Sequence, residues 1–248
     1  MSKHTSKINA LVLGAGFGKR LLPLTSHLPK VLVPYLGAPM ISYNLAKVAK
    51  LEPENIFVNA HYQADKLEGF LKSIHLDTVF NHEKEILGTA GTIKKLLEES
   101  SCDSVFIANG DIICDLDYKK LLKHHQDSDA IVTMAYRPHN LVSNPVYFQD
   151  GRLQHIGENK SFDATLKRSF CGIYVVKRSL LEYFEPGDFD IVNVFKRCYE
   201  KINGMEHTGF WQDLGSHADY LHAQTLGLKN QSIRTLAHEI WDWDVWGV

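Results

Sequence analysis

A glycine-rich loop follows the first apolar run of the chain, and this arrangement constrains the fold more than any other feature. The run over residues 8–13 is apolar and β-prone, and Gly14, Ala15, Gly16 and Gly18 come directly after it. Glycines at such a place let backbone N–H groups approach a phosphate closely. We therefore expect a buried strand whose carboxyl end leads into a phosphate-binding loop.

Two common phosphate-binding templates do not fit this loop. A Walker A loop ends in Gly-Lys-Ser/Thr, whereas here Arg20 follows Lys19. A dinucleotide fingerprint leads straight into a helix and has an acidic residue about 20 positions further on. Here four of the eight prolines interrupt residues 23–39, and no Asp or Glu occurs between Gly18 and Glu52. Neither a Walker nor a dinucleotide site is expected.

Two cations stand in this proline-stiffened segment, Arg20 and Lys30. A triphosphate needs backbone amides for its oxygens and side-chain cations for the charge that develops during reaction. The alternative is a structural loop with solvated cations. Glycines, prolines and cations occur together here, which favours a nucleotide site.

The rest of the chain alternates short apolar runs with stretches of helical spacing. Strands are predicted over 56–58, 105–108, 130–136, 146–148, 153–156 and 170–176, and helices over 40–51, 64–74, 92–99, 118–125, 192–199 and 218–226. This alternation predicts an α/β fold of three layers, with a mostly parallel mixed sheet covered on both faces. Asp150-Gly151 predicts a hairpin between two of the strands.

We expect one domain over residues 1–227 and a Trp-rich tail over 228–248. The tail holds three of the four tryptophans, and the alternation over 241–245 suits an extended segment with one apolar face. Such a face would pack on the body of the protein or on a second subunit. The sequence therefore leaves the oligomeric state open between a monomer and a homo-oligomer.

Composition excludes several classes of function. The 248 residues carry 27 basic and 29 acidic side chains, a net charge of -2, so no general basic field exists to hold nucleic acid. No signal-peptide pattern and no membrane-length apolar run occur, so we expect a cytoplasmic protein that binds no membrane. Four cysteines without C-x-x-C spacing predict neither a disulfide framework nor a zinc site, and the 13 histidines form no constellation and are expected at the surface.

Asp111 is the first candidate metal ligand. The apolar run 105–108 ends in Asn109-Gly110-Asp111, and a carboxylate at the carboxyl end of a buried parallel strand faces the crevice where ligands bind. Its hard oxygens suit Mg²⁺. The alternative for Asp111 is a turn or capping role, as we expect for Asp117. Asp213 lies in a second segment, directly before a helix that Ser216 is expected to cap, and taken alone it is expected to be a loop residue.

The loop residues resemble a known family. Gly14-Ala15-Gly16-Phe17-Gly18-Lys19-Arg20-Leu21, followed by Pro23-Leu24-Thr25 and by Pro29-Lys30-Val31-Leu32-Val33-Pro34, is similar to the signature of the sugar-1-phosphate nucleotidylyltransferases. The resemblance continues to about Leu226. It implies a Rossmann-like nucleotidyltransferase fold and an enzyme that uses Mg²⁺ to join a nucleoside triphosphate to a sugar 1-phosphate, releasing pyrophosphate.

The resemblance also implies roles for individual residues. Arg20 would neutralise the leaving pyrophosphate, Lys30 would hold the α-phosphate or the sugar phosphate, and Asp111 and Asp213 would hold the metal. Position 19 is often Thr in this family and is Lys here. The residues expected to bind the nucleotide are Gly14, Ala15, Gly16, Gly18, Lys19, Asn59, Glu85, Gly88, Thr89 and Gly110. Those expected at the sugar are Asn144, Glu158, Lys160 and Gly172.

The identity of the base and sugar stays open between alternatives. Residues 87–91, Leu-Gly-Thr-Ala-Gly, resemble the mannose-1-phosphate guanylyltransferases, which favours GTP with mannose or heptose 1-phosphate. Thr89 could instead simply cap the next helix. Departures at the expected sugar positions resemble short bacterial members, which leaves UTP with N-acetylmuramate or hexose 1-phosphate as the alternative. A regulatory relative without catalysis would lose a loop cation or a carboxylate, and this chain keeps all four.

Overall fold

The computed structural model describes residues 7–138 and 145–242, and the chain forms two compact units. The first, called the N-terminal unit below, comprises residues 10–86, 108–116 and 209–248. The second, called the central unit, comprises residues 1–9, 87–107 and 117–208. Each unit is therefore assembled from segments that lie far apart in the sequence. The single domain expected over 1–227 stays a prediction.

Three parallel strands form the sheet of the N-terminal unit, in the order β5-β4-β1. They are β1 (Ile8–Leu13), β4 (Ile56–Ala60) and β5 (Val79–His82). Leu13 stands opposite Asn59, and Asn59 stands opposite Asn81. Because parallel strands end at the same edge of a sheet, the loop after β1 and the residues after β4 and β5 are neighbours.

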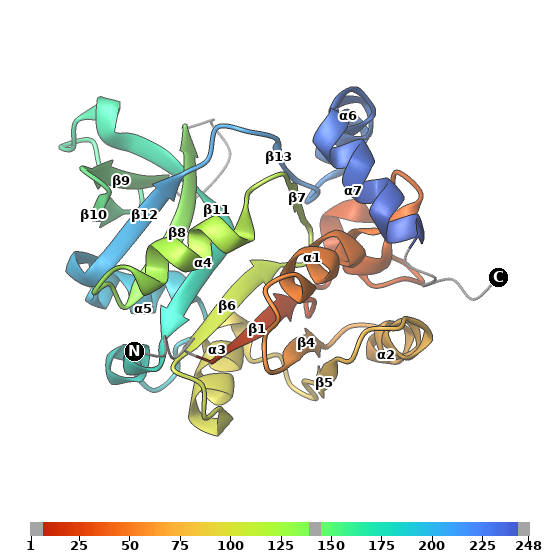
Figure 1. The fold of residues 1–248 in the computed structure, drawn as a ribbon, viewed down its shortest axis with the longest axis horizontal. Helices are drawn as coiled ribbons and strands as arrows, with labels where there is room; N and C mark the ends of the chain where they lie inside the picture. The colour runs from red at the N-terminus through yellow and green to blue at the C-terminus, as the bar shows by residue number, and fades with distance from the viewer. Residues whose placement is uncertain (1–6, 139–144, 243–248) are drawn as a thin grey trace, which may run out of the picture. The chain divides into compact units, whose positions relative to one another are not determined.

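Helices and two short strand pairs complete the N-terminal unit. The helix α1 (Met40–Ala49) has eight buried residues and contacts α7 (Gln231–Asp242), which in turn contacts α6 (His217–Lys229) (Figure 1). Tyr35, Tyr43 and Ile233 are among the fully buried side chains of this core. The remaining elements are α2 (Ala64–Ser73), β2 (Pro34–Tyr35) paired with β3 (Ala38–Pro39), and β7 (Ile112–Cys114) paired with β13 (Trp211–Asp213).

The central unit contains a mixed sheet in the order β6-β11-β8-β12-β10-β9. In it β12 runs parallel to β8, whereas β11 is antiparallel to β8 and β10 is antiparallel to β12 and β9. The strands are β6 (Ser104–Asn109), β8 (Val132–Pro138), β9 (Pro145–Gln149), β10 (Arg152–Ile156), β11 (Lys167–Lys177) and β12 (Ile202–Glu206). The helices are α3 (Gly88–Glu99), α4 (Tyr118–Gln126) and α5 (Ile191–Arg197).

Local sequence signals explain several boundaries. The Asp117 side chain accepts a hydrogen bond from the Lys120 N–H at the start of α4, and Ser216 accepts one from the Asp219 N–H at the start of α6. Both predicted caps are thus confirmed. The predicted hairpin is confirmed as well, because Asp150-Gly151 joins β9 to β10 with positive φ at both residues, as a tight hairpin turn requires.

Other expectations were wrong. The alternation around Trp241 predicts an extended segment, but α7 continues to Asp242, so Trp241 lies in a helix; residues 243–248 lie outside the described part. His125 is fully buried rather than at the surface. Sequence patterns also missed β2, β3, β5, β7, β12 and β13. All of these except β12 have only two to four residues, and β5 is only half-buried, so it lacks an apolar run. The strand β12 lacks such a run as well, because Asn203 and Gly204 interrupt it.

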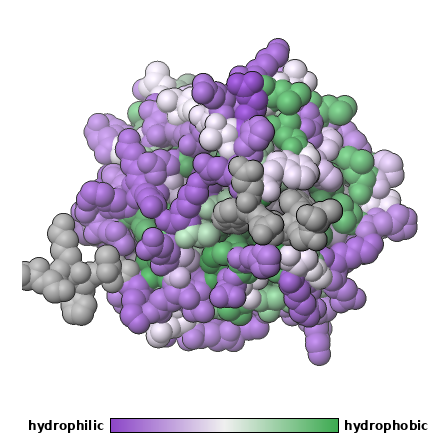
Figure 2. All heavy atoms as spheres, turned by 45° about the vertical axis from the view of Figure 1, so that its right-hand side comes forward, coloured by the Kyte–Doolittle hydropathy of each residue, from purple (hydrophilic) through white to green (hydrophobic). Residues whose placement is uncertain are grey.

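Polar side chains dominate the surface. Figure 2 shows hydrophilic residues over most of one face, with hydrophobic residues in smaller areas between them. Large apolar side chains exposed among the described residues include Phe17, Leu22 and Leu24 of the glycine-loop region and Leu221 and Leu228 of α6. No helix within 7–138 and 145–242 has both the length and the apolar composition of a membrane span.

Candidate active site

The glycine loop begins at the end of β1 and packs closely against the end of β4. The Gly14 N–H donates to Asn59 Oδ1 at 2.8 Å, and a Cβ at Gly14 would lie 2.8 Å from the Asn59 carbonyl oxygen. Any side chain at position 14 would therefore push the two strands apart. Gly14 is buried, whereas Gly16 is exposed and has open space around it, so the crest of the loop faces solvent.

The second half of the loop folds back on the segment that carries Lys30. Gly18 has φ +64, and its carbonyl oxygen accepts hydrogen bonds from the Thr25 hydroxyl and the Leu21 N–H, both at 2.9 Å. A Cβ at Gly18 would lie 2.9 Å from Thr25 Cγ2 and 3.0 Å from Lys30 Cβ. Glycine is therefore needed here both for the left-handed conformation and for the close approach.

The turn that carries Asp111 is held from two sides. The Gly110 N–H donates to the Leu13 carbonyl oxygen at 2.9 Å, and a Cβ at Gly110 would lie only 2.6 Å from that oxygen. On the other side, Asn44 Nδ2 of α1 donates to the carbonyl oxygens of Asn109 at 3.1 Å and of Ile112 at 2.8 Å. Asp111 is thus fixed next to the end of β1.

The short pair of β7 and β13 brings Asp213 beside Asp111. Asp213 is in register with Ile112, the residue after Asp111. The Leu214 N–H also donates to the Asp111 carbonyl oxygen at 3.2 Å. Two aspartates about a hundred positions apart in sequence are therefore adjacent in the N-terminal unit.

Lys30 and Arg20 border these carboxylates. The Lys30 side chain is buried, and its Nζ contacts Asp111 Oδ2 and lies 3.9 Å from Asp213 Oδ1. A Cβ at Gly215 would lie 2.8 Å from Arg20 Nη2 and 2.9 Å from Asp213 Oδ1, so the guanidinium and the carboxylate both border Gly215. We call Arg20, Lys30, Asp111 and Asp213 the charged cluster.

Within the charged cluster, Asp213 is the carboxylate whose ionised form is disfavoured. Burial raises the pKa of Asp213, the nearby Asp111 carboxylate raises it further, and Lys30 and Arg20 oppose the shift. The Oδ1 atom of Asp213 is enclosed, although 45% of the side chain is exposed, and no hydrogen bond satisfies this atom. A cation between the two carboxylates would relieve both effects.

The donor set of the charged cluster fits Mg²⁺. Mg²⁺ is often held by one or two carboxylates, with substrate phosphates and water as the other ligands. Asp111 and Asp213 provide two neighbouring carboxylates, one with an unsatisfied enclosed oxygen. Among residues 7–138 and 145–242, no group of three or more His, Cys, Asp or Glu side chains is placed to hold a metal. A dedicated cage made by the protein alone is therefore not seen there.

The structure places the other expected nucleotide residues in different settings. Lys19 Nζ lies over the Phe17 ring, 5.2 Å from its centroid, and Glu85 is exposed in the N-terminal unit. Gly88 and Thr89 belong to the central unit. Thr89 does not cap α3, which begins at Gly88; its hydroxyl accepts a hydrogen bond from the Ile191 N–H at 3.0 Å.

The expected sugar residues also lie in the central unit or outside the described residues. The Glu158 carboxylate accepts hydrogen bonds from Lys167 Nζ at 2.8 and 3.0 Å, and Lys160 is exposed. Gly172 is in β11 with φ +72, and Asn144 lies outside the described residues. The roles expected for these positions at the sugar stay predictions.

Sequence reasoning missed three residues that shape this site. Asn44 holds the Asp111 turn, Gly215 makes room for Arg20, and Glu83 hydrogen-bonds Asn59. Nothing in the sequence distinguishes Glu83, which is 3% exposed, from the exposed Glu85 two positions later. Gly215 follows Asp213 by two positions, so the sequence signal for it is a glycine beside a candidate metal ligand.

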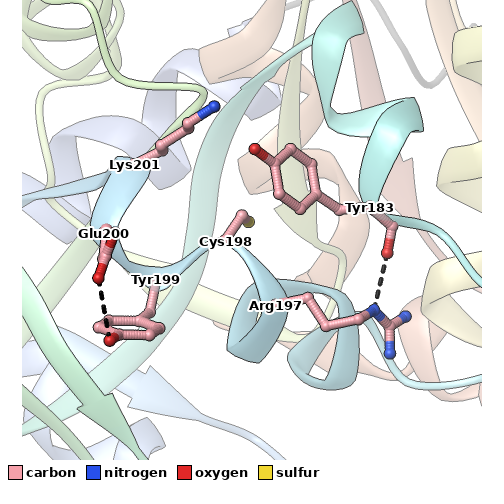
Figure 3. A pocket seen from close by; sticks show the side chains of 6 residues that line it. All are labelled: Tyr183, Arg197, Cys198, Tyr199, Glu200 and Lys201. Atoms are coloured by element: carbon pink, nitrogen blue, oxygen red, sulfur yellow. Dashed lines mark hydrogen bonds between the residues drawn. The ribbon is translucent and has the colours of Figure 1, made fainter.

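The central unit also has a separate, open cavity of about 270 Å³ (Figure 3). It is lined by Tyr183, Arg197, Cys198, Tyr199, Glu200 and Lys201. Its charged groups are already engaged: Arg197 Nε donates to the Tyr183 carbonyl oxygen, the Tyr199 hydroxyl donates to Glu200, and Lys201 lies over the Tyr183 ring. Burial raises the pKa of the Cys198 thiol to about 11, so this thiol is a poor nucleophile at neutral pH.

Comparison with known proteins identifies relatives over most of the chain. The sequence profile of the family described as "Nucleotidyl transferase" matches residues 9–230. The chain is 30% identical over 234 residues to the mannose-1-phosphate guanylyltransferase catalytic subunit beta of Drosophila pseudoobscura pseudoobscura, covering 89% of this chain and 62% of that protein. Identity to the protein of the same name from Xenopus tropicalis is 29% over 241 residues, with 92% and 66% covered. The chain thus spans less than two thirds of these relatives.

Solved structures share the fold. UDP-glucose pyrophosphorylase complexed with UDP-glucose gives a TM-score of 0.76 at 18% identity, covering 90% of this chain and 99% of that one. The inositol-1-phosphate CTP transferase of T. maritima gives 0.73 at 19% identity, covering 95% and 96%. The predicted α/β fold with a mixed sheet is confirmed. Because the family profile covers nearly the whole chain, the resemblance at the glycine loop holds along it, and the chain belongs to the nucleotidyl transferase family.

Proposed function

We propose that this protein transfers a nucleoside monophosphate from a nucleoside triphosphate to a sugar 1-phosphate, giving a nucleoside-diphosphate sugar and pyrophosphate. The observation that carries the proposal is the charged cluster beside the glycine loop. Two cations and two carboxylates meet where the Leu13 carbonyl oxygen binds the Gly110 N–H, at the end of β1. The names of the relatives, which are mannose-1-phosphate guanylyltransferases, support the same class of reaction.

The reaction needs no side chain of the protein to act as a general base. The second pKa of a phosphate monoester is about 6, so the attacking oxygen is already anionic near neutral pH and needs no general base. Catalysis then depends on alignment and on neutralising charge around the α-phosphorus. The site fits this requirement, because cations rather than an acid–base pair border its carboxylates.

Each residue of the charged cluster has a distinct task in this proposal. Asp111 and Asp213 would hold Mg²⁺, which supplies charge neutralisation at phosphate oxygens when bound. Arg20 stabilises the negative charge on the leaving pyrophosphate. Lys30 binds the oxygens of the α-phosphate, and its ammonium already lies next to both carboxylates. Exposed N–H groups at the crest of the glycine loop bind the remaining phosphate oxygens.

We further propose that GTP is the preferred nucleotide and that mannose or a similar hexose or heptose 1-phosphate is the acceptor. Guanine presents two neighbouring donors, N1–H and the 2-amino group, and a carboxylate can accept from both at once. Glu85 is exposed in the N-terminal unit and offers such a carboxylate. Uracil offers one donor beside carbonyl oxygens, which a carboxylate would repel.

A matrix of substrates tests the proposal. Pyrophosphate release is measured with GTP, UTP, CTP, ATP and dTTP, each with mannose, heptose, glucose and N-acetylmuramate 1-phosphates, and each without any acceptor. We expect release that needs both substrates and is at least about tenfold faster in kcat/KM with GTP than with UTP. Binding of a sugar nucleotide without release for any pair would show a regulatory relative instead, and a UTP preference would overturn the assignment of the base.

A further inference from the structure

A buried carboxylate outside the charged cluster lies at the end of β5. Glu83 is 3% exposed, and its Oε1 accepts a hydrogen bond from Asn59 Nδ2 at 2.7 Å. Its backbone is also fixed, because the Glu83 N–H donates to the Ala60 carbonyl oxygen at 2.8 Å and the Glu83 carbonyl oxygen lies 2.8 Å from His61 Nδ1. Burying a carboxylate costs free energy unless hydrogen bonds within the protein replace those it made with water, so we expect the buried Glu83 to have a specific role.

Glu83 and the Gly14 N–H together fix which way the Asn59 amide points. A backbone N–H can only donate a hydrogen bond, whereas a side-chain amide has one donating and one accepting end. Oδ1 therefore faces the Gly14 N–H at 2.8 Å, and Nδ2 donates to Glu83 Oε1 at 2.7 Å. With the amide reversed, two donors would face each other at Gly14 and two acceptors at Glu83.

This chain of hydrogen bonds ends at the first residue of the glycine loop. Asn59 is itself only 3% exposed, so its amide is a part of the interior rather than of the substrate surface. The Gly14 N–H is occupied by Asn59, which leaves the N–H groups further along the loop for phosphate oxygens. The direction of the loop as it leaves β1 thus depends on the Asn59 amide.

We propose that Glu83 is a positioning residue for triphosphate binding: through Asn59 it fixes the start of the glycine loop and so the direction of the loop N–H groups. This inference rests on the proposed function, in which the loop binds the triphosphate. It makes Glu83 distinct from Glu85, since Glu83 acts on the phosphate end of the nucleotide and does not choose the base.

Reversing the polarity of the hydrogen-bond chain tests the proposal. Asn59→Asp places a second acceptor against Glu83, and we expect KM for the triphosphate to rise at least about tenfold, because a shift of about 1 Å in a binding element costs up to 10²-fold. Glu83→Gln alone keeps an oxygen for Asn59 and should lower kcat/KM by about threefold or less. In the double variant the amide introduced at position 83 can donate to the new carboxylate at position 59, which still accepts from Gly14. We expect kcat/KM of this variant to recover to within about threefold of the unmodified protein.

Matched measurements separate positioning from a structural or base-reading role. Thermal shift with each triphosphate reports binding without turnover, so it tests this inference even if no sugar phosphate is accepted. Glu68→Gln, at a partly exposed residue paired with Lys72 on α2, is the control for the chemical change. If Asn59→Asp does not fold, Glu83→Met removes the acceptor and should raise KM in the same way. A double variant no better than Asn59→Asp, or a changed ranking of nucleotides in Glu83→Gln, would overturn the proposal.

Discussion

Gly215 is the residue whose substitution separates the geometry of the charged cluster from the stability of the fold. A Cβ there would lie 2.8 Å from Arg20 Nη2 and 2.9 Å from Asp213 Oδ1, whereas ordinary contacts begin at 3.4 Å. In Gly215→Ala, each atom must therefore move by about half an ångström or more. Both are ends of side chains, so they can move without unfolding the protein, but they can no longer hold their present positions.

The expected loss of rate follows from that displacement. Removing one preorganised charge donor typically costs about 10²- to 10³-fold in kcat, and displacing a catalytic group by about 1 Å costs up to 10²-fold. We therefore expect Gly215→Ala to lower kcat by about 10- to 100-fold. The melting temperature should change by less than about 3 °C, because a shift confined to two side-chain ends costs well under 1 kcal/mol.

A matched glycine provides the control for this prediction. Gly69 lies on the exposed face of α2 with open space around its Cβ position, so Gly69→Ala should keep full activity and stabilise the helix by about 0.5–1 kcal/mol. Steady-state pyrophosphate release and thermal melts of both variants are compared. Full activity in Gly215→Ala would refute the placement of Arg20 and Asp213, and unfolding of that variant would show that the segment is structural.

Three further predictions concern other residues. Lys30→Ala should lower kcat by about 10²-fold or more, as measured by pyrophosphate release, and an unchanged kcat would contradict its role. Burial lowers the pKa of His125 to about 3, and Lys177 and His124 add to this shift. As the pH falls below 6.5, the ordinary pKa of His, the imidazole is therefore protonated in the unfolded state but not in the folded state. Unfolding titrations should show the free energy of unfolding falling by about 2 kcal/mol from about pH 6.5 to 5, and by less in His125→Gln. Glu85→Gln should reduce the GTP:UTP ratio of kcat/KM by about tenfold, and an unchanged ratio would mean that the backbone alone reads the base.

The sequence was most informative where one local pattern determines one local structure. The apolar run before Gly14, the caps at Asp117 and Ser216 and the turn at Asp150-Gly151 each depend on a few adjacent residues, and all were predictable. The helix α7 carries such a local pattern too, because Ile233, Leu236, Ala237 and Ile240 have the i, i+3, i+4, i+7 spacing of one helix face. The alternation of Trp and Asp over 241–245 pointed instead to an extended segment.

Parts of the site that depend on long-range contacts could not be predicted in the same way. The two aspartates were found as separate motifs, but their proximity depends on the pairing of β7 with β13, two three-residue strands that carry almost no sequence signal. Asn44 looks like an ordinary helix residue until the Asp111 turn is seen to accept its two hydrogen bonds. Glu83 likewise gains meaning only through a hydrogen bond to a residue 24 positions away.

The exchange of one carboxylate for an amide tests the central claim most directly. Pyrophosphate release from the best pair of substrates is measured for Asp111→Asn and for Asp117→Asn, which make the same chemical change six residues apart. Asp117 only caps α4, and Asn caps helices as well as Asp does, so we expect the second variant to keep its rate. Asp111→Asn should fold normally and lose at least about 10²-fold in kcat, since an amide is a neutral and poorer Mg²⁺ ligand. Equal rates in the two variants would contradict the assignment of the charged cluster as the active site.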